Sequence, residues 1–101
     1  MADSVQFNYS IVETPYGDYF GKITLRKIGH HYLGELVDDE DGSSHHLKVI
    51  KYDGKEFVFA LKFDGLKFVF SCRIVGDSLV GTGVSRREDF EFLLKGKLIR
   101  N

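Results

Sequence analysis

Tryptophan is absent from this sequence, and cysteine and proline each occur only once. The single cysteine, Cys72, cannot form an internal disulfide, so the core must hold the fold, and cysteine use gives no sign of an oxidising compartment. One proline beside 43% hydrophobic residues is typical of a folded globular protein and not of a disordered segment. At 101 residues we expect a single domain over residues 1–101.

The sequence also lacks an excess of positive charge and a long apolar run. Fourteen Lys and Arg against 15 Asp and Glu leave a net charge of −1, which argues against nucleic acid as a partner. No segment approaches the roughly 20 apolar residues of a membrane helix, and the opening MADSVQFNYS has no leader pattern. We therefore expect a soluble cytoplasmic protein with no membrane partner, although a secreted form expressed without its leader would read the same way.

Strand patterning fills the chain instead. Short segments rich in Val, Ile, Phe and Tyr alternate with polar residues and end at Gly, Asp or Pro. The expected strands are Val5–Val12, Tyr19–Ile28, His31–Asp38, Ser44–Tyr52, Lys55–Phe63, Leu66–Val75, Ser78–Ser85 and Phe90–Ile99. Their short connections favour antiparallel neighbours, since a parallel neighbour needs a crossover of about a dozen residues. The prediction is an all-β, antiparallel, eight-stranded up-and-down meander, closed or nearly closed into a small barrel.

An eleven-residue repeat, YDGKEFVFAL followed by FDGLKFVFSC, occupies the second half. Asp-Gly is the favoured pair of a two-residue type I′ turn, so hairpin tips are expected at Asp53-Gly54 and at Asp64-Gly65. We interpret the repeat as equal strands between equal turns and not as a duplicated binding unit.

Alternation of side chains along each strand predicts which residues point into the barrel. The expected inward residues are Val5, Phe7, Tyr9, Ile11, Tyr19, Gly21, Ile23, Leu25, Tyr32, Gly34, Leu36, Phe57, Phe59, Leu61, Phe63, Phe68, Phe70, Cys72, Ile74, Leu79, Gly81, Gly83, Phe90, Phe92, Leu94, Gly96 and Leu98. The inward glycines mark sharp bends or the close approach of another group. If the phenylalanines leave space beside them, a small hydrophobic ligand could bind there, and the candidate ligand-binding residues are Gly21, Gly34, Phe57, Phe59, Phe68, Phe70, Gly81 and Gly83.

The run GDSLVGTG (residues 76–83), followed by a strand ending FLLKGKLIR (residues 92–100), resembles the last two strands of small lipocalin-like (calycin) domains. The chain departs from that family in having no Gly-x-Trp near its start. The resemblance implies a barrel or half-barrel with an apolar interior, which either holds a small hydrophobic ligand or serves as an accessory domain.

Several residues are of types that could serve as catalytic or metal-binding groups. Gly76-Asp77-Ser78-Leu79 matches the signature of GDSL esterases, but every histidine lies upstream of the serine, so we interpret the segment as a turn. In the histidine pairs, His30-His31 and His45-His46, adjacent residues point to opposite faces of a strand and so cannot readily share one ion. We expect no metal, no cofactor and no catalytic site; the best candidates for a hydrolase or metal site are His31, Glu35 and His46. Cys72 is expected to be a buried, inert thiol.

Outward-facing apolar residues are the last feature of the second half. They are Val58, Ala60, Val69, Val75, Val80, Val84, Leu93 and Ile99, on four consecutive expected strands. Large exposed apolar patches tend to mark association sites, so Val58, Val69, Val80, Val84 and Leu93 are candidate interface residues of a homo-oligomer, with a dimer favoured.

The sequence therefore predicts a non-catalytic binding or interaction module, which holds a small hydrophobic ligand or self-associates through its outer face. The alternative is a structural, oligomeric protein with a filled core and no ligand.

Overall fold

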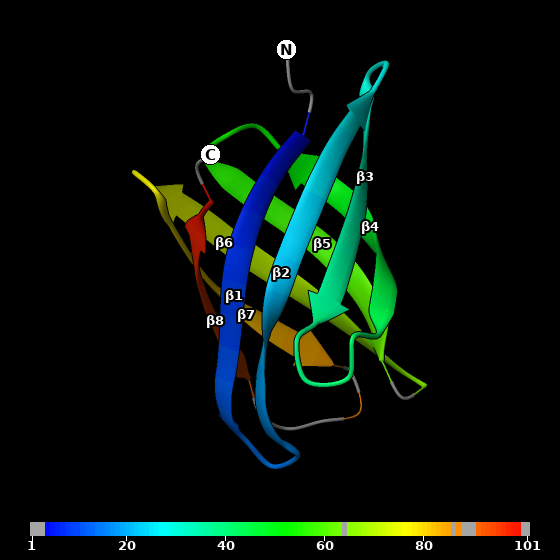
Figure 1. Cartoon of the computed structure of the whole chain (residues 1–101), viewed down its shortest axis with the longest axis vertical. Helices are drawn as coiled ribbons and strands as arrows, with labels where there is room; N and C mark the ends of the chain where they lie inside the picture. Colours follow the sequence, from blue (N-terminus) through cyan, green and yellow to red (C-terminus); the bar gives the residue numbers. More distant parts are fainter. Residues whose placement is uncertain (1–3, 64, 86, 88–90, 100–101) are drawn as a thin grey trace.

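The structure, a computed structural model, describes residues 4–63, 65–85, 87 and 91–99 (Figure 1). These residues form eight β-strands. The strands are β1 (Ser4–Thr14), β2 (Gly17–Ile28), β3 (His31–Asp38), β4 (Ser44–Tyr52), β5 (Glu56–Phe63), β6 (Leu66–Val75), β7 (Ser78–Ser85) and β8 (Phe92–Leu98). Within the described ranges there is no helix with the length and apolarity that crossing a membrane requires.

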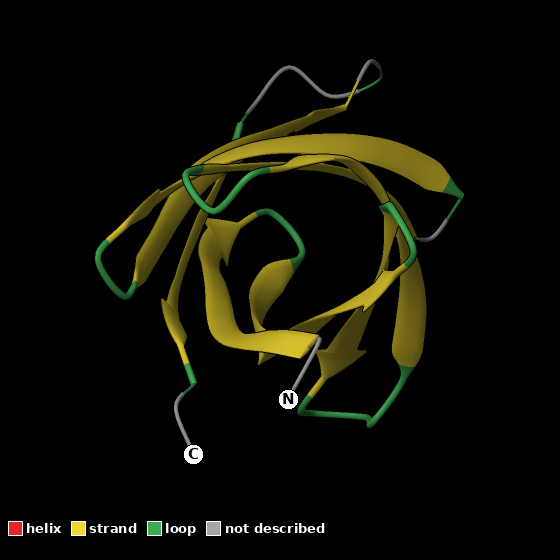
Figure 2. Cartoon of the chain, turned by 90° about the horizontal axis from the view of Figure 1, so that it is seen from above, coloured by secondary structure: helices red, strands yellow, loops and turns green. Residues whose placement is uncertain are grey.

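Each strand pairs antiparallel with the next one, and the first and last strands close the ring. The β1–β8 ladder runs from Phe7 opposite Leu98 to Ile11 opposite Leu94, and seen along its length the molecule is a ring of strands (Figure 2). The prediction of an all-β, antiparallel, up-and-down barrel is confirmed, and the barrel is closed. Closure gives every strand two neighbours and so leaves no bare sheet edge.

The predicted alternation holds along most strands. Eight large side chains are almost completely buried. They are Phe7, Ile23, Leu25, Leu47, Phe57, Phe59, Leu79 and Leu94. Phe90 and the side chain of Phe63, which were also expected inside, lie outside the part of the chain that is described.

Strand β4 changes its alternation at a bulge. Val49 lies opposite Phe59 and Tyr52 lies opposite Phe57, so one extra residue is accommodated between them on β4. Both Val49 and Tyr52 pack against the core, whereas Ile50 is 55% exposed. A bulge of this kind shifts the face on which later residues lie.

The turn at Asp53-Gly54 differs from the expected two-residue type I′ turn. That turn needs positive φ at both central residues; Gly54 has φ 86°, but Asp53 is not among the described residues with positive φ. The carboxylate of Asp53 instead accepts hydrogen bonds from the backbone N–H groups of Lys55 (2.9 Å) and Glu56 (2.7 Å). An Asp at the start of a turn can close it through its own side chain, so only the glycine needs a left-handed conformation. In the second repeat, Asp64 lies outside the described residues.

Candidate functional site

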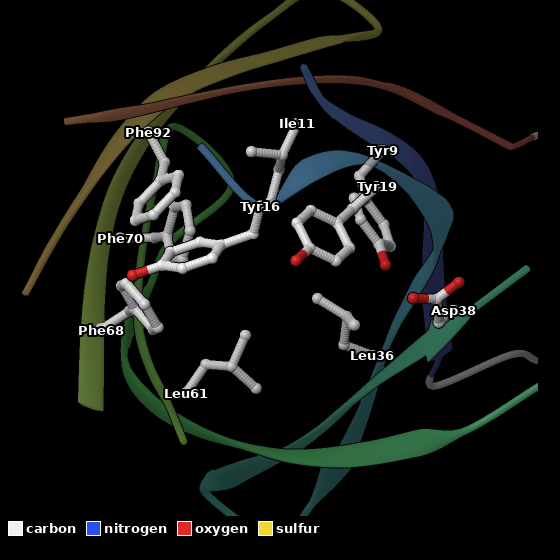
Figure 3. Close-up of a pocket in the computed structure, with 10 residues that line it drawn as sticks. All are labelled: Tyr9, Ile11, Tyr16, Tyr19, Leu36, Asp38, Leu61, Phe68, Phe70 and Phe92. Atoms are coloured by element: carbon white, nitrogen blue, oxygen red, sulfur yellow. The ribbon is translucent and has the colours of Figure 1, made fainter. Parts of the chain in front are cut away.

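A cavity of about 60 Å³ opens at the end of the barrel that carries the β1–β2 and β3–β4 turns. Figure 3 shows the side chains around it. Its lining residues are Tyr9, Ile11, Tyr16, Tyr19, Leu36, Asp38, Leu61, Phe68, Phe70 and Phe92. The space is several times the roughly 10–15 Å³ that one water molecule needs, so it suits a compact molecule.

The lining residues meet there because of strand register. Ile11 on β1 lies opposite Tyr19 on β2, and Leu61 on β5 lies opposite Phe68 on β6. Each of these residues lies on the inward face of its strand, near the end of the barrel that carries the β1–β2 and β3–β4 turns. The almost completely buried core residues lie mainly toward the other end. The barrel is therefore filled at one end and hollowed at the other.

Phenylalanines form one wall of the cavity. The rings of Phe59 and Phe70 are stacked, with centroids 5.1 Å apart and planes 13° apart, which fixes Phe70 from the core side. Phe68 meets Phe92 edge to face at 5.0 Å. Such pairs add roughly 0.5–1.5 kcal/mol beyond their burial. This wall is therefore held in place by contacts between the rings themselves.

The opposite side of the cavity is polar. Tyr9, Gly21 and Asp38 are register partners in one row across β1, β2 and β3. A Cβ added to Gly21 would lie 2.8 Å from Cε2 and 2.9 Å from the hydroxyl oxygen of Tyr9, so the phenol occupies the space that a side chain on Gly21 would fill. In Figure 3 the hydroxyls of Tyr9 and Tyr19 lie on the same side of the cavity as the carboxylate of Asp38.

Electrostatics at this polar side favour protonated groups. Burial raises the pKa of the Tyr9 hydroxyl, and the negative charges of Asp38, Asp39 and Asp41 raise it further. Tyr9 is therefore a neutral hydrogen-bonding group across the ordinary pH range. The ionisable side chains that line the cavity are one carboxyl and three tyrosine hydroxyls.

The residues proposed from the sequence to bind a ligand divide into two groups. Phe68 and Phe70 line the cavity, whereas Phe57 and Phe59 are fully buried in the core.

The four candidate glycines contact core atoms. A Cβ on Gly34 would lie 2.9 Å from Cβ of Leu47, one on Gly81 would lie 2.5 Å from Sγ of Cys72, and one on Gly83 would overlap the ring of Phe70. A Cβ on Gly21 would overlap the backbone oxygen of Val37 as well as approach the Tyr9 phenol, so at all four glycines neighbouring backbone or side-chain atoms leave no room for a Cβ.

The candidate polar residues lie on the outer surface. Glu35 and His46 are register partners on β3 and β4, and both are exposed. His31 is also exposed and lies four residues before Glu35 on the same strand, roughly 13 Å away along an extended chain. Among the residues that the structure describes, no group of three or more His, Cys, Asp or Glu side chains could hold a metal ion.

The two remaining chemical candidates are Ser78 and Cys72. Ser78 begins β7 directly after the turn at Gly76, whose φ is 61°. Cys72 faces the core and is 4% exposed. Burial raises the pKa of the Cys72 thiol to about 12. A thiol in this state is a poor nucleophile at neutral pH.

The candidate interface residues lie on the outside of β5 to β8. Val80, Val84 and Leu93 are 43%, 47% and 44% exposed. Val69 lies between Ala60 and Val84 in one row across three strands. The next row contains Val58 and Leu93 with Ser71 and Thr82 between them, and Val80 is flanked by Arg73 and Lys95. The apolar surface is therefore smaller than its residue list suggests.

Comparison with known proteins returned no match among family models, curated proteins or solved structures. The resemblance to lipocalin-like domains accordingly extends to the coarse architecture, an eight-stranded antiparallel closed barrel.

Strand alternation in the sequence indicates most of the cavity's wall residues as inward-facing but does not indicate the cavity itself. Tyr9, Ile11, Tyr19, Leu36, Leu61 and Phe92 were expected inside, but nothing in alternation indicates which end of a barrel stays open. Asp38 carried a usable signal, because it follows Leu36 by two residues and so shares its inward face. Tyr16 lies in a turn, where strand alternation gives no prediction.

Proposed function

We propose that this protein is a non-catalytic binding module that holds a small, largely apolar ligand in the cavity at the end of the barrel with the β1–β2 and β3–β4 turns. The observation that carries the proposal is the cavity itself, about 60 Å³ in volume and lined by six aromatic rings. Ligand pockets are typically concave, mostly apolar and largely preformed, with a few polar groups that orient the ligand. The stacked and edge-to-face phenylalanines supply the preformed wall, and Tyr9, Tyr19 and Asp38 supply the polar groups.

The test is a titration of the isotope-labelled chain with benzyl alcohol, a neutral molecule with one ring, followed by two-dimensional NMR. We expect chemical-shift changes at residues around the cavity, including Ile11, Leu36 and Leu61. Leu61→Phe should abolish them because the larger side chain fills the space, while Leu98→Phe, at the opposite end of the barrel, should leave them in place. Shifts that arise elsewhere, or that survive Leu61→Phe, would refute the proposal.

We further propose that the outer face of β5 to β8 allows self-association. The supporting observation is the pair of Val69 and Val84, which are register partners on β6 and β7; Val69 is half-buried and Val84 is 47% exposed, while Ala60, next to Val69 on β5, is buried. A charge there should dissociate an oligomer, since burying an unpaired charge is costly.

The matched variants for this second proposal are Val69→Lys and Leu33→Lys, the latter on the outside of β3 where Leu33 is 48% exposed. Light scattering coupled to size-exclusion chromatography should show a dimer for the native chain and for Leu33→Lys, and a monomer for Val69→Lys. A native chain that is monomeric at high concentration would contradict self-association and leave the cavity proposal untouched.

A further inference from the structure

Asp38 is buried more deeply than its role in the β3–β4 turn requires. Its carboxylate oxygen Oδ1 accepts a hydrogen bond from the backbone N–H of Glu40 at 2.8 Å. Asp41 and Asp53 make the same kind of bond to the residue two positions later, at 2.8 and 2.9 Å, and both are exposed. Asp38, by contrast, is 7% exposed and forms part of the cavity wall. Capping a turn therefore does not explain why a carboxylate is buried here.

A buried carboxylate is costly unless a positive group or several hydrogen bonds compensate it. Within the described part of the chain, the ion pairs join Lys51 to Asp53 and to Glu56, and none involves Asp38. The cavity thus has, at one side, a carboxyl group with no ion-pair partner among the described residues. A cation bound in the cavity would add a positive partner to the hydrogen bond that the carboxylate already accepts from the N–H of Glu40.

The rest of the lining selects for an organic cation. Six rings surround the space, from Tyr9, Tyr16, Tyr19, Phe68, Phe70 and Phe92. The faces of aromatic rings attract cations, and aromatic cages are a recurrent way of recognising substituted ammonium groups. Calcium or magnesium would need several oxygen ligands, whereas the cavity offers one carboxylate.

The charged residues around the opening of the cavity also favour a cation. Asp39, Glu40 and Asp41 follow Asp38 on the exposed β3–β4 turn. The negative charges of Asp39 and Asp41 act electrostatically on a group that lines the cavity, since both help to raise the pKa of the Tyr9 hydroxyl. The described cations at this end of the barrel include Lys62 and Lys67, register partners on β5 and β6, and Arg87, two residues after the end of β7; all three are exposed. Attraction of a cation to the acidic side is therefore stronger than for an anion or a neutral molecule.

We infer that the cavity binds a small organic ammonium ion, whose charged nitrogen lies against Asp38 and whose apolar body lies against Phe68, Phe70 and Phe92. This inference rests on the proposed binding function and names its ligand class. Figure 3 shows the two halves of such a site, with the carboxylate on one side of the cavity and the phenylalanine rings on the other.

The experiment compares three probes that share one ring: benzylammonium, benzyl alcohol and benzoate, each titrated into the full chain at pH 7 and followed by NMR. A hydrogen bond to a charged group contributes about 1.5–3 kcal/mol, so benzylammonium should bind roughly 10-fold or more tightly than benzyl alcohol. Benzoate should bind most weakly. Equal binding of the ammonium and the alcohol would overturn the inference and leave the proposed function standing, while failure of all three probes to bind would overturn both.

Asp38→Asn tests the residue, because asparagine can still accept the hydrogen bond from Glu40. We expect the preference for benzylammonium over benzyl alcohol to disappear in this variant. Asp53→Asn, which removes one charge at the opposite end of the barrel, should retain it. A preference that survives Asp38→Asn would overturn the inference.

Salt dependence in the native chain provides a measurement that does not depend on the folding of a variant. Buried pairs are screened much less than exposed ones. The preference for benzylammonium should therefore persist in about 0.5 M NaCl. At this salt concentration the Debye length is only a few ångströms, so exposed charges are largely screened. Complete loss of the preference would assign it to the exposed acidic turn and overturn the role of Asp38.

Discussion

Replacing Gly83 by alanine should destabilise the barrel through a single identifiable contact. A Cβ at this position would lie 2.5 Å from Cζ and 2.6 Å from Cδ2 of Phe70, whereas carbon atoms in contact prefer roughly 3.5–4.0 Å. The ring must therefore move by about 1 Å. Its stacking on Phe59, with centroids 5.1 Å apart, opposes movement toward the core, so the cavity is the direction left open.

The size of the effect follows from these opposing terms. Overpacking of a core costs about 1–3 kcal/mol. A gain of about 0.4–1 kcal/mol from the stiffer unfolded chain offsets part of it, because Gly83 has no positive φ that alanine would resist. We expect a net loss of about 1–2 kcal/mol in the free energy of unfolding. In a domain of this size that corresponds to a decrease in Tm of roughly 4–16 °C.

Urea denaturation of a double-mutant cycle isolates the contact. Gly83→Ala is measured in the native background and again with Phe70→Leu, whose smaller side chain leaves room for the new methyl group. The cost of Gly83→Ala should fall below about 0.5 kcal/mol in the Phe70→Leu background, because contacting residues show coupling of this order. An equal cost in both backgrounds, or a native cost near zero, would refute the close packing of Phe70 on Gly83.

Two further predictions concern ionisable groups. With its pKa raised to about 12, Cys72 should be only about one part in ten thousand thiolate at pH 8, so iodoacetamide should alkylate it in urea and leave it intact in the native protein, as measured by mass spectrometry. Comparable rates in the two states would contradict its burial. Hydrogen bonds from the N–H groups of Glu56 and Lys55 lower the pKa of the Asp53 carboxyl in the folded state. A lowered folded pKa contributes stability above the unfolded pKa of about 4 that is lost as the pH falls below it, so the urea midpoint of the native chain should fall more between pH 7 and pH 3 than that of Asp53→Asn. Identical losses would show that these hydrogen bonds do not favour the ionised form.

Much of the fold was predictable because short-range rules agree along the chain. Alternating residues such as Phe68, Phe70 and Cys72 share one face of a strand whatever surrounds them, and the structure places all three inside. The register of Glu35 with His46 follows from the length of the β3–β4 turn. The bulge in β4 was not predictable, since an extra residue that changes the alternation leaves no separate mark in the sequence.

The candidate site was only partly predictable. The inward glycines were expected to mark bends or the close approach of another group, and Phe70 does lie close over Gly83. The ligand space that was expected beside them, if the phenylalanines left any, is filled at Gly83 by that ring. Which space is then left empty depends on the volumes of side chains from β1, β2, β3, β5, β6 and β8 together. A pattern within one strand cannot predict this remaining volume.

The sequence by itself determined the strands, most of their inward faces and the antiparallel order, because strand alternation and short connections are local properties. Only the tertiary structure decided that β1 closes on β8, that the interior is filled at one end and open at the other, and that the carboxylate of Asp38 lies in the wall of the open end. These features arise from contacts between residues far apart in the chain, where packing volume and burial are properties of the whole barrel.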